Sequence, residues 1–224
     1  MKTIVISLGG SIIVPDKVDI KFLKGFKSLI EKFVKKSYRF GIYCGGGKLA
    51  RDYQKAASSV SKVSQTQLDW LGTHATWLNA DLMVNIFGNI ADTCFIIDPT
   101  KKIRSKKKAL IAGGWKPGWS TDYDAVLLAK NLGAKIIVNM TNVDYVYDKD
   151  PKKSKNAKPI KETTWKGLRK LVGSKWKAGL NMPFDPIASK EAEKSKLSVA
   201  IIGKNLKNLE KLLKGKKFKG TIIR

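Results

Sequence analysis

Glycine pairs and triplets that follow short apolar runs limit most strongly what this chain can fold into. The first is Leu8-Gly9-Gly10-Ser11 and the second is Cys44-Gly45-Gly46-Gly47-Lys48. A strand that ends at glycines before a helix presents bare backbone N–H groups, which bind anions. A side chain there would keep the backbone away from a phosphate. Two such turns predict two phosphate-bearing ligands, or one ligand held at both ends.

Strand-like and helix-like patterns alternate along the chain. We expect strands at residues 3–8, 39–44, 93–97, 108–112, 135–140, 199–202 and 221–223, and helices at 20–36, 49–57, 66–87, 122–132, 164–172, 187–194 and 206–213. This alternation predicts an α/β fold, a three-layer α/β/α sandwich with a largely parallel sheet. Ligands bind such sheets at the carboxyl ends of the strands, so the turns are expected to face one crevice.

Composition narrows the class of protein. The 224 residues suffice for one domain, 1–224, with two lobes of about 1–133 and 134–224 that divide near a lysine-rich loop at 141–159. No apolar run reaches the ~20 residues of a membrane span, and the N-terminus does not resemble a signal peptide. We therefore expect a soluble cytoplasmic protein.

Cys44 and Cys94 are predicted to be buried free thiols, and a single histidine, His74, excludes a histidine-rich metal site.

The charge is extreme, because 44 lysines and arginines face 18 acidic residues, giving +26. Such a field attracts polyanions and steers nucleotides. The lysines are dispersed over helix surfaces and loops, which favours a solvated lysine surface. Nucleic-acid binding, or nonspecific polyanion affinity without a biological role, stays open as an alternative.

Two further turns carry polar groups. After Gly113-Gly114, the hydroxyls of Ser120 and Thr121 and the carboxylate of Asp122 stand at a helix start. This turn predicts either an acceptor-phosphate loop, in which Asp122 organises cations, or a capped loop without a ligand. The segment 139–151 ends a strand with Thr141 and Asn142, and it lacks the glycine and glutamate of a calcium loop.

The motifs together resemble one family. They are S-L-G-G-S at 7–11, C-G-G-G-K-L-A-R-D-Y at 44–53, G-G-W-K-P-G-W-S-T-D at 113–122, T-N-V-D-Y-V-Y-D-K-D-P at 141–151 and D-P-I-A-S-K at 185–190. In this order they resemble the amino acid kinase superfamily, and within it the archaeal-type uridylate (UMP) kinases. P-loop and dinucleotide-binding patterns are not found.

The resemblance implies transfer of the γ-phosphoryl group of ATP to UMP by direct in-line attack, with Mg²⁺ carried by the nucleotide. It also implies a homo-oligomer, a hexamer in the family. The implied ATP-binding residues are Gly9, Gly10, Ser11, Gly47, Arg51, Thr141, Asn142, Tyr147 and Asp150. The implied UMP-binding residues are Gly46, Asp69, Trp115, Lys116, Pro117, Gly118, Trp119, Ser120 and Thr121. The expected catalytic residues are Asp122, Lys48 and Lys190, and no protein-held metal site is expected.

The chain departs from the family pattern at several positions. Ser7 stands where many members carry a lysine, which leaves Lys48, Arg51 and Lys190 as candidate cations. Trp115 and Trp119 replace a threonine and a histidine in the acceptor loop, and each offers an aromatic face with one N–H donor. The alternatives are another small-molecule kinase of the superfamily, with a phosphate, carboxylate or carbamate acceptor, or a weakly active nucleotide- or nucleic-acid-binding protein.

Overall fold

The computed structural model describes residues 1–149, 154, 156–172 and 183–224. Its middle layer is a seven-stranded sheet in the order β3-β2-β1-β4-β8-β9-β7. The strands of this sheet are β1 (Lys2–Leu8), β2 (Tyr38–Cys44), β3 (Ala109–Ala112), β4 (Ile136–Met140), β7 (Glu162–Thr163), β8 (Ser198–Ile202) and β9 (Thr221–Ile223). Neighbours from β3 to β8 pair in parallel, whereas β9 runs antiparallel to β8.

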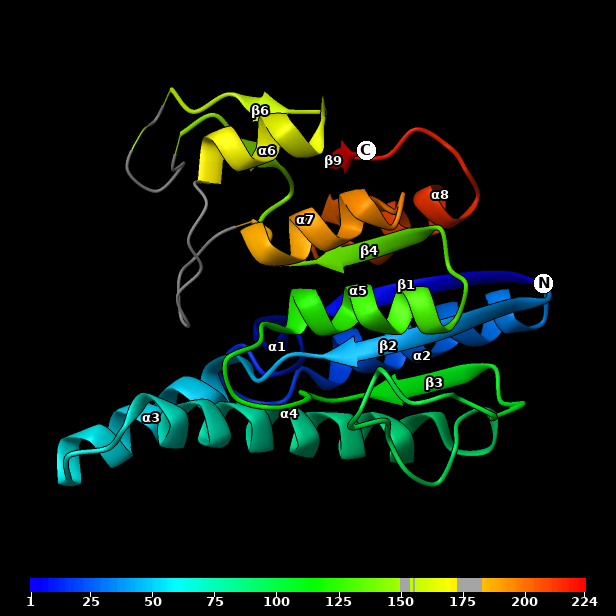
Figure 1. Cartoon of the computed structure of the whole chain (residues 1–224). Coiled ribbons are helices and arrows are strands. Elements are labelled where there is room, and N and C mark those ends of the chain that lie inside the picture. Colours follow the sequence, from blue (N-terminus) through cyan, green and yellow to red (C-terminus); the bar gives the residue numbers. More distant parts are fainter. Residues whose placement is uncertain (150–153, 155, 173–182) are drawn as a thin grey trace.

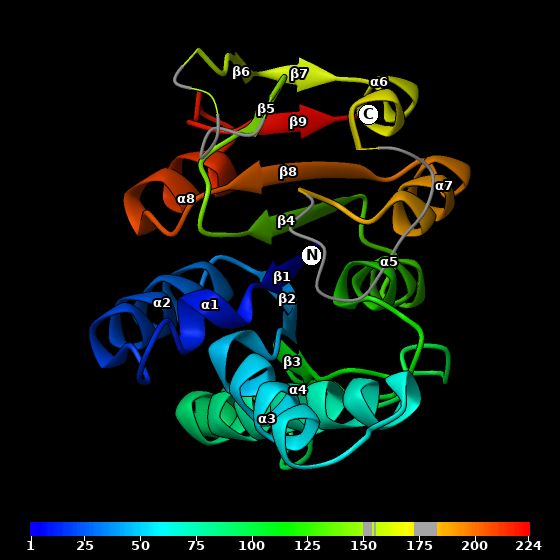
Figure 2. The same cartoon turned by 90° about the vertical axis from the view of Figure 1, so that its left-hand side faces the viewer.

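Helices cover both faces of this sheet (Figures 1 and 2). One side carries α1 (Gly10–Ile13), α2 (Ile20–Val34) and α8 (Leu206–Leu213), and the other carries α5 (Thr121–Asn131), α6 (Trp165–Val172) and α7 (Pro186–Lys194). The long helix α4 (Gln65–Phe87) packs with α3 (Gly47–Val60) and lies beside β3. The predicted three-layer sandwich with a largely parallel sheet is confirmed.

Alternation within β1 explains why two cores form. Ile4, Ile6 and Leu8 belong to the apolar cluster shared with α2, α4 and α8, whereas Val5 belongs to the cluster shared with α5 and α7. Successive strand side chains point to opposite faces of a sheet. A strand with apolar residues on both of its faces therefore supplies both cores, as expected for a sheet buried on both sides.

Two predictions about the segment before β3 are wrong. Residues 93–97 do not form a strand, because only Ala91 and Ile96 make isolated bridges to β3 and the chain bends between them. Cys94, predicted to be buried, is exposed on this segment, whereas Cys44 in β2 is buried as predicted. A continuous strand would have placed Cys94 against the sheet.

Several short elements were not anticipated. They are α1, the 3₁₀ turn Gly88–Ile90, the hairpin of β5 (Val146–Tyr147) with β6 (Pro159–Ile160), and β7 at the sheet edge. Each has four residues or fewer, so none carries a detectable periodicity. Among the described helices, none combines the length and apolarity that a membrane crossing requires.

Candidate active site

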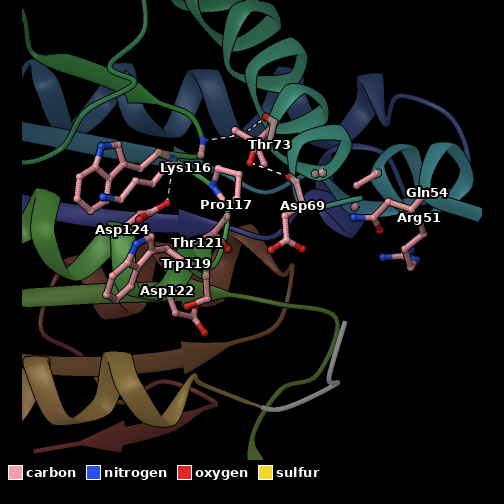
Figure 3. Close-up of a pocket in the computed structure, with 18 of the residues that line it drawn as sticks. Arg51, Gln54, Asp69, Thr73, Lys116, Pro117, Trp119, Thr121, Asp122 and Asp124 are labelled. Carbon is pink, nitrogen blue, oxygen red and sulfur yellow. Dashed lines mark hydrogen bonds between the residues drawn. The ribbon is translucent and has the colours of Figure 1, made fainter. Parts of the chain in front are cut away.

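A cavity of about 650 Å³ lies where β1, β2, β3 and β4 end. Figure 3 shows side chains from α3, α4 and the loop before α5 converging on it. Its lining residues are Ser11, Gly46, Gly47, Ala50, Arg51, Gln54, Asp69, Gly72, Thr73, Thr76, Gly114, Trp115, Lys116, Pro117, Trp119, Ser120, Thr121, Asp122, Asp124, Thr141 and Asn142. The strand-end turns that the sequence singled out thus share one crevice.

The first two glycine turns pack directly on each other. Gly45 donates its N–H to the Leu8 carbonyl at 2.9 Å, and Gly9 donates to the Met140 carbonyl at 3.0 Å. A Cβ atom on Gly10 would lie 2.5 Å from the Gly45 carbonyl oxygen, and Gly47 has a φ of +64°. Only glycines permit this close approach. The helices α1 and α3 begin here, with no acidic residue in either first turn, so their N-termini suit an anion.

Helix α4 fixes the loop of residues 113–120, here named the acceptor loop. Thr76 accepts a hydrogen bond from the Gly114 N–H at 2.6 Å, and the Trp77 indole N–H donates to the Gly114 carbonyl at 2.7 Å. Farther along, the Gly118 N–H donates to the carboxylate of Asp69 at 3.0 Å. Helix α4 therefore holds the loop at Gly114, through Thr76 and Trp77, and at Gly118, through Asp69, which lies about two helical turns earlier.

Three carboxyl groups gather at the start of α5. Asp122 accepts a hydrogen bond from the Asp185 N–H at 3.1 Å, and Asp185 accepts one from the Ser120 hydroxyl. Asp124, only 1% exposed, accepts from the Tyr43 hydroxyl at 2.8 Å. Burial raises the pKa of Asp122 and of Asp124 to about 7, and it raises the pKa of Asp185.

These shifts predict that the protein loses stability as the pH rises from about 4 to about 7. Below the ordinary aspartate pKa of about 4, folded and unfolded chains both carry the Asp124 proton. Between that value and the folded pKa of about 7, only the unfolded chain releases it, so unfolding becomes easier. Above about 7 the loss is complete. Asp122 acts in the same direction.

Urea unfolding at pH about 5 and at pH about 8 tests the predicted loss of stability, with Asp124→Asn as the comparison variant. Asparagine does not titrate, so the fall of the unfolding midpoint between pH about 5 and about 8 should be smaller in the variant. Equal falls in both proteins would show that Asp124 does not carry the raised pKa.

Most predicted site residues lie in the cavity, and some do not. Gly9 and Gly10 lie in the turn packed against it, and Gly118 lies in the acceptor loop without lining it. Tyr147 lies in β5, away from the cavity lining, and Asp150 falls outside the described residues. The remaining predicted nucleotide-binding residues all line it.

The expected catalytic lysines are not among the lining residues. Lys48 pairs with Asp52 at 2.6 Å and with Asp16 at 3.5 Å, and Lys190 is exposed on α7. Among the described residues that line the cavity, Arg51 and Lys116 are the ones with a positive charge. Arg51 projects from α3 beside Gln54 (Figure 3) and lines the cavity.

The sequence did not single out several cavity residues. Gln54 follows Arg51 by three positions, and Thr73 and Thr76 follow Asp69 by four and seven. Helical spacing from the residues already identified would have found them. Asp124 carried no such signal, because a buried carboxylate is recognised only when its neighbours are known. Asp185 opens the D-P-I-A-S-K motif, but the sequence assigned it no role.

Comparison with known proteins agrees with this geometry. Residues 2–203 match the amino acid kinase family, and the chain belongs to that family. It is 36% identical over 224 residues to a uridylate kinase of Thermococcus sibiricus, with 98% of each chain covered. It is 34% identical to a uridylate kinase of Thermoplasma acidophilum, covering 99% of this chain and 96% of that one. The crystal structure of uridylate kinase from Archaeoglobus fulgidus has a TM-score of 0.85, 33% identity and full coverage of both chains.

Proposed function

We propose that this protein phosphorylates UMP with ATP, giving UDP and ADP. The observation that carries the proposal is that one cavity is bounded by the paired glycine turns on one side and by the acceptor loop on the other. A donor phosphate and an acceptor phosphate held there would be adjacent, and direct transfer needs little beyond such positioning and charge neutralisation. Full-length similarity to uridylate kinases supports UMP as the acceptor.

The proposed roles follow the position of each group. The glycine turns, with Ser11, Gly47, Arg51, Thr141 and Asn142, hold ATP, and Arg51 neutralises phosphate charge. Gly46, Asp69 and the acceptor loop hold UMP. Asp69 Oδ2 accepts from the Gly118 N–H and Asp69 Oδ1 accepts from the Gln65 side chain at 2.7 Å, so a sugar hydroxyl would bind this carboxylate by displacing Gln65 or by sharing its oxygen. Asp122 orients the cationic groups. Tyr147 and Asp150 at the adenosine end, and Lys48 and Lys190 in catalysis, remain proposals from the resemblance.

Mg²⁺ would enter with ATP. The described residues contain no group of three or more acidic, histidine or cysteine side chains suited to a metal ion. The Asp122 carboxylate lines the cavity and fits a single contact to a metal whose other ligands are phosphate oxygens and water. When bound, the metal supplies neutralisation of phosphate charge.

The remaining properties are also proposals. A homo-oligomer, a hexamer by resemblance, is supported by apolar side chains exposed on α4, with Trp70 39% and Leu78 61% exposed. Division into lobes of about 1–133 and 134–224, a cytoplasmic location, and nonspecific polyanion binding through the +26 charge complete the proposal.

An ADP-release assay with MgATP and a panel of nucleoside monophosphates tests the function. UMP should be the preferred acceptor, with no turnover of free phosphate or carboxylates. Absence of turnover with every monophosphate, despite measurable ATP binding, would refute UMP phosphorylation. A salt-steep affinity for RNA without turnover would instead support a nucleic-acid-binding role.

A further inference from the structure

The first turn of α5 makes contacts to the acceptor loop that no family motif explains. Asp124 Oδ2 accepts a hydrogen bond from the Trp115 backbone N–H at 3.1 Å, and it accepts a second one from the Tyr43 hydroxyl at 2.8 Å. Tyr43 is fully buried in β2, and Asp124 is 1% exposed. A buried carboxylate thus joins a rigid sheet strand to the backbone of the loop, and Figure 3 shows Asp124 directly below that loop.

A ladder of aromatic rings also holds the same loop. Trp119 stacks on Tyr123 of α5 at a centroid distance of 4.2 Å and an interplanar angle of 22°. Trp115 stacks on Trp119 at 6.2 Å, and the Lys116 ammonium lies 4.0 Å from the Trp115 ring centre. Trp119 thus contacts aromatic rings of Trp115 and Tyr123, while Trp115 and Trp119 both still line the cavity. The stacking stiffens the loop.

We propose that Asp124, held by Tyr43, is a positioning residue that fixes the acceptor loop for the phosphate acceptor. The inference rests on the proposed function for the identity of the acceptor. Asp124 Oδ1 is buried with no hydrogen-bond partner among the described residues. Leaving a buried carboxylate oxygen unpaired costs stability, which a role purely in packing does not explain. Positioning of the loop is the gain that offsets this cost.

The alternative is that Tyr43 and Asp124 form a polar pair that matters only to the core. A double variant separates the two. Tyr43→Phe with Asp124→Val removes both side-chain polar groups together, so the Tyr43 hydroxyl is no longer left unpaired in the core and the unfolding midpoint should recover relative to Asp124→Val alone. The double variant still lacks the acceptor for the Trp115 N–H.

The test measures hydrogen exchange of residues 113–120 in the ligand-free protein, together with KM for UMP and for ATP. In Asp124→Val and in the double variant, exchange of the loop should quicken, and KM for UMP should rise about tenfold while KM for ATP stays unchanged. Asp124→Asn should stay close to wild type, because its amide oxygen accepts both hydrogen bonds.

Leu128→Ala is the matched control, since Leu128 is a fully buried residue of α5 in the same core. It should lower stability and leave both the loop exchange and KM for UMP unchanged. Wild-type exchange and KM in the double variant, or an equal rise of KM in Leu128→Ala, would overturn the proposal. If the wild-type protein fails to phosphorylate UMP, the proposed function fails, and hydrogen exchange alone then decides whether Asp124 fixes the loop.

Discussion

Gly10→Ala is expected to lower ATP affinity by at least about a hundredfold. The new Cβ would lie 2.5 Å from the Gly45 carbonyl oxygen and from the Gly46 carbonyl carbon. These neighbours are backbone atoms of the second glycine turn, so no side-chain rotation relieves the overlap. The two turns must separate, and the N–H groups that would bind phosphate then lose their shared geometry. Isothermal calorimetry with MgATP measures the loss.

Gly215→Ala controls for the general cost of replacing a glycine. Gly215 has a φ of +68°, and a Cβ there meets nothing within 4 Å. That variant should lose about 1 kcal/mol of stability from its left-handed backbone and bind ATP normally. Wild-type affinity in Gly10→Ala would show that the paired turns do not bind the nucleotide.

Asp122→Asn is expected to reduce kcat by about a hundredfold or more while changing KM for ATP and UMP little. The amide oxygen can still accept the hydrogen bond from the Asp185 N–H, so the local fold should persist. The negative charge that orients cations at the transferred phosphate is lost. Steady-state kinetics above pH 8 measure the effect, because the Asp122 pKa of about 7 leaves the wild-type group ionised there.

Asp81→Asn serves as the control, since Asp81 is an exposed aspartate of α4 outside the cavity lining. It should leave kcat unchanged. An Asp122→Asn enzyme with the kcat of the wild type would remove Asp122 from the catalytic residues.

The parallel sheet was predictable because its buried strands are mostly apolar and its helices carry clear hydrophobic periodicity. β1 and α2 are examples, and both appear within two residues of their expected bounds. The strand predicted at residues 93–97 was wrong because Phe95 and Ile96 give this segment a strand-like composition. There the chain bends, and pairing with β3 is limited to single bridges. Pairing of this kind depends on the neighbouring strand, which local sequence does not encode.

The site was predictable where backbone geometry dictates residue type. The glycine turns and the Ser120 cap line or border the cavity, and so does Asp69, which only the family resemblance had indicated. The ladder of Trp115, Trp119 and Tyr123 was not predictable, because each tryptophan alone is compatible with a ligand contact or with packing. Only the observed stacking shows that the rings bind one another.

The isolated β-bridges that Ala91 and Ile96 make to β3 limit strand addition at this edge of the sheet. An edge strand with free N–H and C=O groups invites another chain to add to the sheet. Here the Ile111 carbonyl accepts from the Ile96 N–H at 2.8 Å, and the Gly113 N–H donates to the Ile96 carbonyl at 3.0 Å. The irregular segment thus occupies the open side of β3, while β7 at the opposite edge is two residues long. Neither border offers a long template for strand addition, which protects the folded chain from amyloid-like growth.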